Sequence, residues 1–167
     1  MTTAIEAKVT TQVYRVFIKA TPQAIWDAIT QPEWTQRYGY GGRGEFDLRP
    51  GGAYRALAPE AMRAMGAPEV VVDGEVIEAD PPRKLVQTWR ALWDPGLVAE
   101  GHRRVTWEIA EAGPGITALT VTHELDGAPK TAAQVAGTTD LASGGGGWSW
   151  ILSDLKTLLE TGKSLES

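Results

Sequence analysis

The clearest helical pattern lies at the C-terminal end of the chain. From Gly147 to Gly162, apolar residues recur at spacings of three and four, which places them on one face of a helix. These residues are Trp148, Ile151, Leu152, Leu155, Leu158 and Leu159. Lys156 and Glu160 take the opposite face, and Gly162 stands where a left-handed C-cap is expected. A helix with one such apolar face must pack on an apolar surface.

Most of the remaining chain alternates between apolar and polar residues, which is the period of a β-strand with one covered face. The segments 103–110 and 116–125 alternate most regularly, and their apolar faces carry Trp107 and His123 respectively. We expect strands over residues 9–20, 44–48, 53–58, 69–79, 84–93, 103–110 and 116–125. These segments predict an antiparallel sheet whose covered face receives the C-terminal helix.

The other segments between the strands predict short helices and loops. Thr21 followed by Pro22 predicts a helix from residue 22 to residue 30, with a second helical turn over 33–38. Segment 59–68 is expected to be a short helix or an irregular flap, to which Met62 and Met65 give an adaptable apolar surface. We expect loops at 94–101 and 126–146, and a loose leader at residues 1–8. The second loop is expected to be flexible, with room for a short helical turn around 132–136.

The predicted fold is therefore α+β. A curved antiparallel sheet of about six to seven strands wraps around a long C-terminal helix, and one or two short helices follow the first strand. Whether the helix and the sheet close tightly or leave a cavity is the functional question. Tryptophan occurs 7 times against 2 phenylalanines. That excess fits either a tryptophan-rich core or an aromatic wall around a bound ligand.

Composition excludes several classes of partner and chemistry. The formal net charge is -5, which disfavours nucleic acid and anionic membranes as partners. The chain has no cysteine and only 2 histidines, so we expect no disulfide, no metal site and no cofactor. Neither a secretory signal nor an apolar run long enough to span a bilayer is visible, and we expect a cytoplasmic protein.

Local sequence patterns along nearly the whole chain match a known family. They are ATPQAIWDAITQPEWTQRY at 20–38, FDLRPGGAYR at 46–55, DGEVIEADPPRKLVQTWR at 73–90 and GGWSWILSDLKTLLETG at 146–162. The chain resembles the START-like (SRPBCC, helix-grip) superfamily. Within it, the match is to the bacterial group related to the C-terminal domain of the activator of the heat-shock-protein-90 ATPase.

This resemblance implies a single START-like domain over 1–167 with a cavity between the sheet and the C-terminal helix. Members of the superfamily include small-molecule binders, polyketide cyclases and aromatases, stress-related proteins and a cochaperone domain, so the fold leaves the function open. Segments 59–68 and 130–145 are longer than the usual family pattern, and both would lie near the mouth of the cavity.

Candidate ligand-binding residues follow from the parity of the strands. Trp89, Trp93 and Trp107 would form an indole wall with Trp148 of the helix, either around a flat aromatic ligand or as plain packing. The remaining candidates that we place at the cavity are Leu152, Tyr54, Gln87, Arg103 and His123.

Two of these candidates carry charge or proton chemistry. His123 is the best catalytic candidate, because an imidazole on the covered face can donate to a ligand carbonyl or act as acid or base; the alternative is a hydrogen-bonded core histidine. Arg103 would hold a carboxylate or phenolate at the rim, or else be a solvated charge at a strand end.

We expect a protein, monomeric or homodimeric, that binds a small hydrophobic or aromatic molecule in the cavity. One alternative is a cyclase-, aromatase- or hydrolase-like enzyme that uses His123 or Arg103, although no catalytic motif is visible. The other alternative is a chaperone-associated interaction module. The glycines before Trp148 suggest that the terminal helix lifts as a lid over the cavity.

Overall fold

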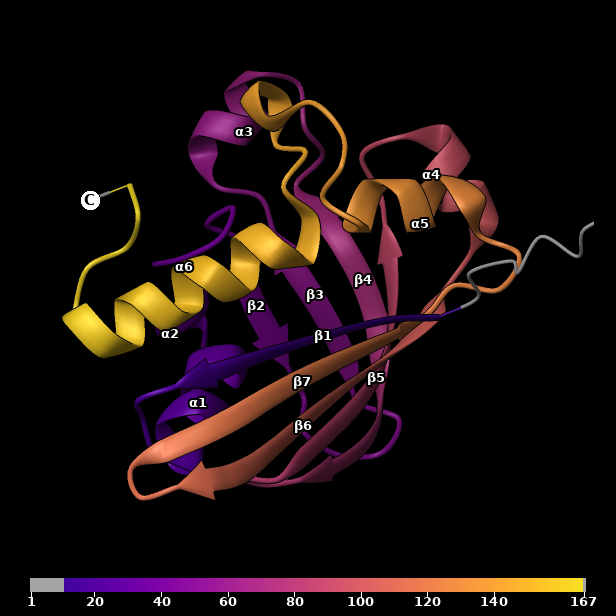
Figure 1. The fold of residues 1–167 in the computed structure, drawn as a ribbon. Coiled ribbons are helices and arrows are strands. Elements are labelled where there is room, and N and C mark those ends of the chain that lie inside the picture. The colour runs from indigo at the N-terminus through magenta and orange to yellow at the C-terminus, as the bar shows by residue number, and fades with distance from the viewer. Residues whose placement is uncertain (1–10, 167) are drawn as a thin grey trace, which may run out of the picture.

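The alternating segments form one seven-stranded sheet (Figure 1). The computed structural model describes residues 11–166, so the expected leader at 1–8 lies outside the described residues. The strand order is β1-β7-β6-β5-β4-β3-β2, and every neighbouring pair is antiparallel, as predicted. The strands are β1 Thr11–Ile18, β2 Arg43–Phe46, β3 Ala53–Leu57, β4 Val70–Asp80, β5 Lys84–Ala91, β6 Arg103–Gly113 and β7 Ile116–Glu124.

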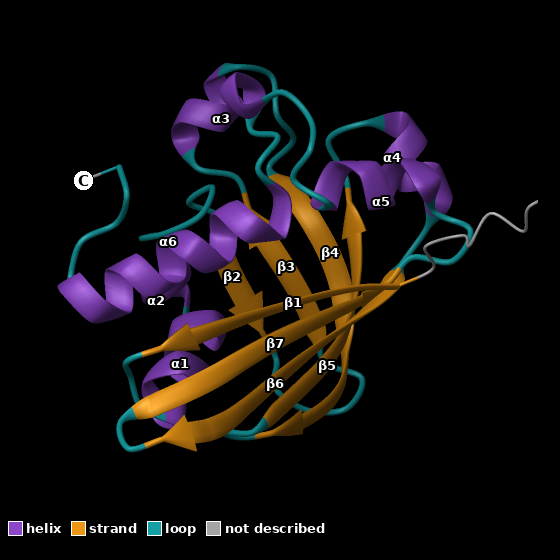
Figure 2. Cartoon of the chain, viewed as in Figure 1, coloured by secondary structure: helices purple, strands orange, loops and turns teal. Residues whose placement is uncertain are grey.

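The C-terminal helix α6, Gly147–Thr161, lies across the concave side of this curved sheet (Figures 1 and 2). Its apolar face is buried as expected, with Trp148, Leu152, Leu155 and Leu158 each inaccessible to solvent or nearly so. Gly162 closes the helix with a φ of 81°, a left-handed conformation that glycine adopts without steric strain. The predicted α+β helix-grip arrangement is therefore confirmed.

Two short helices follow β1, as the sequence predicts. Helix α1, Pro22–Thr30, begins where the Thr21 hydroxyl accepts a hydrogen bond of 3.1 Å from the Ala24 amide. Helix α2, Pro32–Thr35, comes after the break that Pro32 imposes. Ile25 and other apolar residues of α1 are fully buried, so α1 helps to close one end of the core under the sheet.

The loops hold more regular structure than the sequence analysis expected. The loop expected at 94–101 contains helix α4, Pro95–Glu100, because the Asp94 carboxylate caps the amides of Gly96 and Leu97. The flexible loop expected at 126–146 contains α5, Pro129–Val135, and the single 3₁₀ turn η1, Leu141–Ser143. Segment 59–68 contains the short helix α3, Glu60–Ala64. Among residues 11–166, no helix combines the length and the apolar character that crossing a membrane requires.

Helix α5 owes its position to a carboxylate that lies far away in the sequence. Glu100 accepts hydrogen bonds from the amides of Lys130 and Thr131, at 2.8 Å and 2.7 Å, and from the Thr131 hydroxyl at 2.7 Å. These amides belong to the first turn of α5, where no partner exists within the helix. A tertiary contact therefore replaces a local N-cap, which explains why the local sequence indicated no more than a possible turn around 132–136.

Candidate functional site

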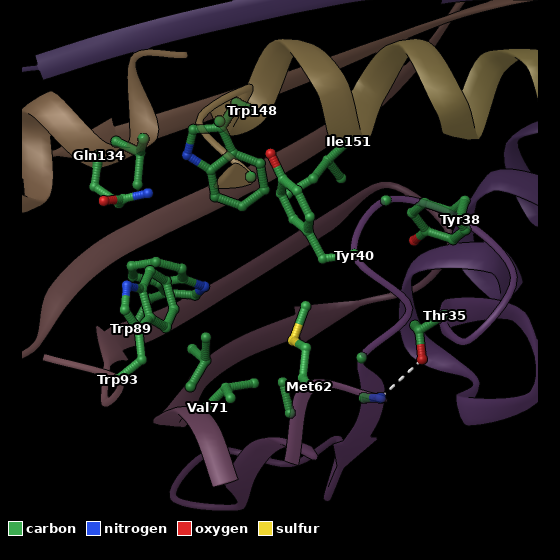
Figure 3. Close-up of a pocket in the computed structure, with 18 of the residues that line it drawn as sticks. Thr35, Tyr38, Tyr40, Met62, Val71, Trp89, Trp93, Gln134, Trp148 and Ile151 are labelled. Carbon is green, nitrogen blue, oxygen red and sulfur yellow. Dashed lines mark hydrogen bonds between the residues drawn. The ribbon is translucent and has the colours of Figure 1, made fainter. Parts of the chain in front are cut away.

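A cavity of about 430 Å³ lies between α6 and the concave face of the sheet. Its walls come from strands β2 to β6, from α1, α2 and the loop 38–42 that follows them, from α3 and α5, and from the first turns of α6. Figure 3 shows Trp148 and Ile151 of α6 on one side of it and Trp89, Val71 and Met62 on the other. The sheet and the terminal helix therefore do not close tightly, and the question left open by the sequence is answered in favour of a cavity.

Indole rings form one wall of the cavity. The ring centroids of Trp107 and Trp148 are 5.3 Å apart at an angle of 87°, and those of Trp89 and Trp148 are 6.2 Å apart. Trp93 meets Trp89 edge to face, with centroids 6.4 Å apart. Edge-to-face packing of this kind fixes each ring against its neighbour. The result is a rigid aromatic wall that presents both ring faces and ring edges to the cavity.

Two buried polar residues behind this wall hold the indoles in place. The Trp107 Nε1–H donates a hydrogen bond of 2.9 Å to the Gln87 Oε1 atom, and the Trp148 Nε1–H donates one of 3.1 Å to the His123 Nδ1 atom. Gln87 and His123 lie in one row across the sheet, because each is paired with Val105 of β6. Both side chains are buried, so they orient the indoles from within the core.

His123 is a neutral residue of this core. Burial lowers its pKa to about 4, so the imidazole carries no charge at neutral pH. Since the Nδ1 atom accepts from Trp148, the proton of the neutral ring sits on the Nε2 atom. That nitrogen is buried and has no hydrogen-bond partner among residues 11–166, and the same holds for the Gln87 Nε2 atom.

The polar groups that do face the cavity are uncharged. Its described lining contains no Asp, Glu, Lys, Arg or His side chain. Burial raises the pKa of Tyr54, so its hydroxyl stays protonated and is a hydrogen-bond donor. The indole N–H groups of Trp89 and Trp93 are further donors at the wall. The Tyr38 hydroxyl, by contrast, is already used in a 2.8 Å bond to the Ala28 carbonyl.

The structure brings together some of the predicted site residues and separates others. Tyr54, Trp89, Trp93, Trp107 and Trp148 line the cavity. Trp93 does so from beyond the end of β5 at Ala91, rather than from within the strand as predicted, and 42% of it is exposed.

The four remaining predicted site residues lie outside the lining, and these are Gln87, Arg103, His123 and Leu152. The parity of a strand gives the face on which a side chain lies but not its depth. The longer indoles extend over Gln87 and His123 and cover them. Arg103 instead donates a 2.7 Å bond to the Glu100 carbonyl at the end of α4.

Other lining residues had no clear signal in the sequence. Tyr38 and Tyr40 come from the glycine-rich loop after α2, and Gln134 and Val135 come from α5. Met62 lines the cavity from α3, in agreement with the adaptable apolar surface that its segment was expected to provide. The pair of tyrosines at 38 and 40 was the only sequence pattern that could have indicated that this loop lines a cavity.

The loop at residues 38–42 is fastened to α6. The Gly39 amide donates a 2.8 Å bond to the buried Asp154 carboxylate, and the Gly39 carbonyl accepts a 3.1 Å bond from the Trp150 indole. The Gly146 amide donates a 3.0 Å bond to the Tyr40 hydroxyl. The first half of α6 and this loop therefore form one connected wall.

The glycines before Trp148 permit close packing at this wall. A Cβ atom at Gly147 would lie 2.2 Å from the Val135 carbonyl oxygen, and one at Gly145 would lie 2.3 Å from the Thr139 hydroxyl. Gly147 also has a φ of 57°. These contacts argue against a hinge at this point, and hence against the expectation that α6 lifts as a lid.

The segment 59–68, which we call the flap, is held much more loosely. Within the described structure, its side chains make no hydrogen bond or ion pair. Its internal hydrogen bonds are those of its own backbone turns. Its base is closed by a 2.8 Å bond from the Ala58 amide to the Glu69 carbonyl. Met65 is 89% exposed. Met62, Met65 and Ala67 of the flap line the cavity, and Figure 3 shows Met62 turned toward it.

Solved structures of similar fold come from several organisms. CalU16 from Micromonospora echinospora, solved by NMR, is 21% identical with a TM-score of 0.62, over 93% of this chain and 68% of that one. The Aha1 dimer from Colwellia psychrerythraea is 19% identical with a TM-score of 0.61, over 92% and 98% of the two chains. An Hsp90 activator from Plasmodium falciparum is 21% identical with a TM-score of 0.52, over 69% and 72%.

The sequence comparisons identify the family. No curated protein sequence matches the chain. The family model for activator of Hsp90 ATPase homolog 1-like proteins matches residues 19–160, which span α1 through α6 and therefore every wall of the cavity. The chain belongs to the family of activator of Hsp90 ATPase homolog 1-like proteins.

Proposed function

We propose that this protein binds a small hydrophobic or aromatic molecule in the cavity between the sheet and α6. The observation that carries the proposal is a preformed space of about 430 Å³, lined by indoles and aliphatic side chains and by no charged residue in its described lining. Small-molecule sites in proteins have this volume and this character. The part of the ligand that enters the cavity is therefore uncharged, since burying an unpaired charge there would be costly.

The rigid indole wall supplies the affinity. Trp89, Trp107 and Trp148 are already packed against one another and held by Gln87 and His123, so little side-chain entropy is lost when a flat ring system binds. The Tyr54 hydroxyl and the indole N–H of Trp93 are donors for acceptor atoms of the ligand. These few polar groups would orient the bound ligand.

No specific observation favours the enzymatic alternative, because the lining offers only hydroxyl, amide and indole groups. A role as an interaction module rests on the family alone. A cytoplasmic location and a monomeric or homodimeric state are part of the same proposal.

The test uses N-phenyl-1-naphthylamine, an uncharged aromatic probe whose fluorescence rises in apolar surroundings. We expect saturable binding, quenching of the tryptophan emission and a rise in melting temperature. Ala56 lies in the cavity wall on β3, and Ala56→Phe fills the space, so it should weaken binding by about tenfold or more.

The matched control is Ala110→Phe, which adds the same ring at an exposed position of β6. It should leave the affinity unchanged. Absence of saturable binding to the wild type, or equal binding by Ala56→Phe and the wild type, would contradict the proposal.

A further inference from the structure

A second hollow adjoins the cavity on its outer side. This groove has a volume of about 580 Å³ and lies between the loop 36–41, α3, the η1 turn and the outer side of α6. It shares part of its lining with the cavity, and the shared residues are Tyr38, Gly39, Tyr40, Met62 and Gly144. At these residues, the wall between the two spaces is a single layer of side chains and glycine backbone.

Met62 is the part of this shared wall that can move most readily. The Tyr40 ring stands between α6 and Met62 (Figure 3), and its hydroxyl is held by the Gly146 amide at 3.0 Å. Met62 approaches from the loosely held flap and has an unbranched, flexible side chain. A rotation of Met62 would therefore join the two spaces without disturbing the fastened loop at 38–42.

The two spaces differ in charge. Arg37, Asp154 and Glu166 line the groove, whereas no charged side chain lines the described cavity. Both oxygens of Asp154 are engaged, one by the Gly39 amide at 2.8 Å and the other by the Leu165 amide at 2.6 Å. The Asp154 carboxylate therefore serves to hold the backbone.

Arg37 is the cation that the groove presents. Its guanidinium lies over the Trp34 ring at 4.7 Å from the centroid, and it makes no ion pair or hydrogen bond within residues 11–166. Stacking on an indole restrains the guanidinium while leaving its N–H edge available, the arrangement that suits recognition of a carboxylate or sulfonate. Glu166 lies in the same groove, and its carboxylate would repel such an anion.

We infer that the groove is a second compartment of the ligand site, which receives an anionic end of the ligand at Arg37 while the uncharged aromatic part occupies the cavity. This inference rests on the proposed function. It restricts the ligand class to elongated aromatic compounds with an acidic group at one end. The net charge of -5 repels free anions, so a preference for an anionic ligand requires a local cation such as Arg37.

A matched pair of probes separates the two compartments. N-Phenyl-2-naphthylamine has only the aromatic part, and 6-anilinonaphthalene-2-sulfonate is the same molecule with one sulfonate added at the far end of the naphthalene. We expect the wild type to bind the sulfonate probe more tightly. Arg37→Gln should weaken binding of the sulfonate probe by about fivefold and leave the uncharged probe unaffected. Glu166→Gln should strengthen binding of the sulfonate probe alone.

The control is Arg63→Gln, which removes an exposed charge on α3 that lines neither space. This variant should leave the affinity for both probes nearly unchanged. Equal binding of the two probes by the wild type, or an Arg37→Gln variant that keeps the wild-type preference, would overturn the inference and leave the proposed function intact. Failure of both probes to bind would overturn the proposed function itself.

Discussion

The indole of Trp148 and the imidazole of His123 form a buried hydrogen bond of 3.1 Å from Nε1 to Nδ1. The first residue belongs to the opening turn of α6 and the second to the C-terminal end of β7. His123 also packs edge to face with Trp89, with ring centroids 5.2 Å apart. One neutral imidazole therefore holds both the helix side and the strand side of the aromatic wall.

This role of His123 predicts a loss of stability in mild acid. Burial lowers its pKa from 6.5 to about 4, so between these values the unfolded state binds a proton that the folded state does not. Stability contributed by this group is fully present above pH 6.5 and is lost as the pH falls toward 4. The whole shift corresponds to about 3 kcal/mol.

The measurement is urea unfolding between pH 4.5 and pH 7, compared with His123→Asn. Asparagine keeps an acceptor for the Trp148 indole but does not titrate in this range. We expect the variant to be less stable at pH 7 and to lose less stability on acidification than the wild type. Parallel pH profiles for the two proteins would show that His123 is not responsible.

The glycine before Trp148 should be far less tolerant of substitution than an unpacked glycine of similar conformation. Gly147 and Gly115 both have positive φ, at 57° and 71°, but a Cβ atom at Gly115 meets nothing within 4 Å. We expect Gly115→Ala to cost about 1 kcal/mol from backbone strain alone. Gly147→Ala adds a clash with the Val135 carbonyl and should cost about 3 kcal/mol or more. Equal unfolding midpoints for the two variants would contradict this account of the glycine run.

Ligand entry should occur through the flap rather than by movement of α6. The flap makes no side-chain hydrogen bond in the described structure, whereas Gly39 and Tyr40 are tied to α6 by Asp154, Trp150 and Gly146. We expect fast amide hydrogen exchange over 60–66 and slow exchange over 147–155. Bound N-phenyl-1-naphthylamine should slow exchange in the flap most. Exchange over 147–155 as fast as in the flap would favour a moving helix instead.

Trp93 offers a way to weaken binding with little effect on folding. It lines the cavity but is 42% exposed, and it follows the end of β5. Trp93→Ala should lower the affinity for N-phenyl-1-naphthylamine by about fivefold, because one aromatic face is lost. The melting temperature should stay close to that of Phe17→Ala, a control at an exposed position of β1. An unchanged affinity would remove Trp93 from the site.

Elements with local signals could be predicted from the sequence. The amphipathic face of α6, the Thr21 cap of α1 and the alternation of β6 and β7 all depend on residues within a few positions of one another. Parity also placed Trp107 and His123 on the covered face correctly, because successive side chains of a strand point to opposite sides.

The depth and the partners of these side chains depend on how the elements pack together. Gln87 and His123 share a face with the tryptophans, yet indoles from other elements cover them, which no one-dimensional pattern records. Helix α5 exists where a distant Glu100 carboxylate supplies its cap. The glycines before Trp148 are explained by neighbouring atoms of Val135, Thr139 and Tyr40. A cavity forms where elements that are distant in the sequence leave space between them. The candidate site could therefore be located only from the packed structure.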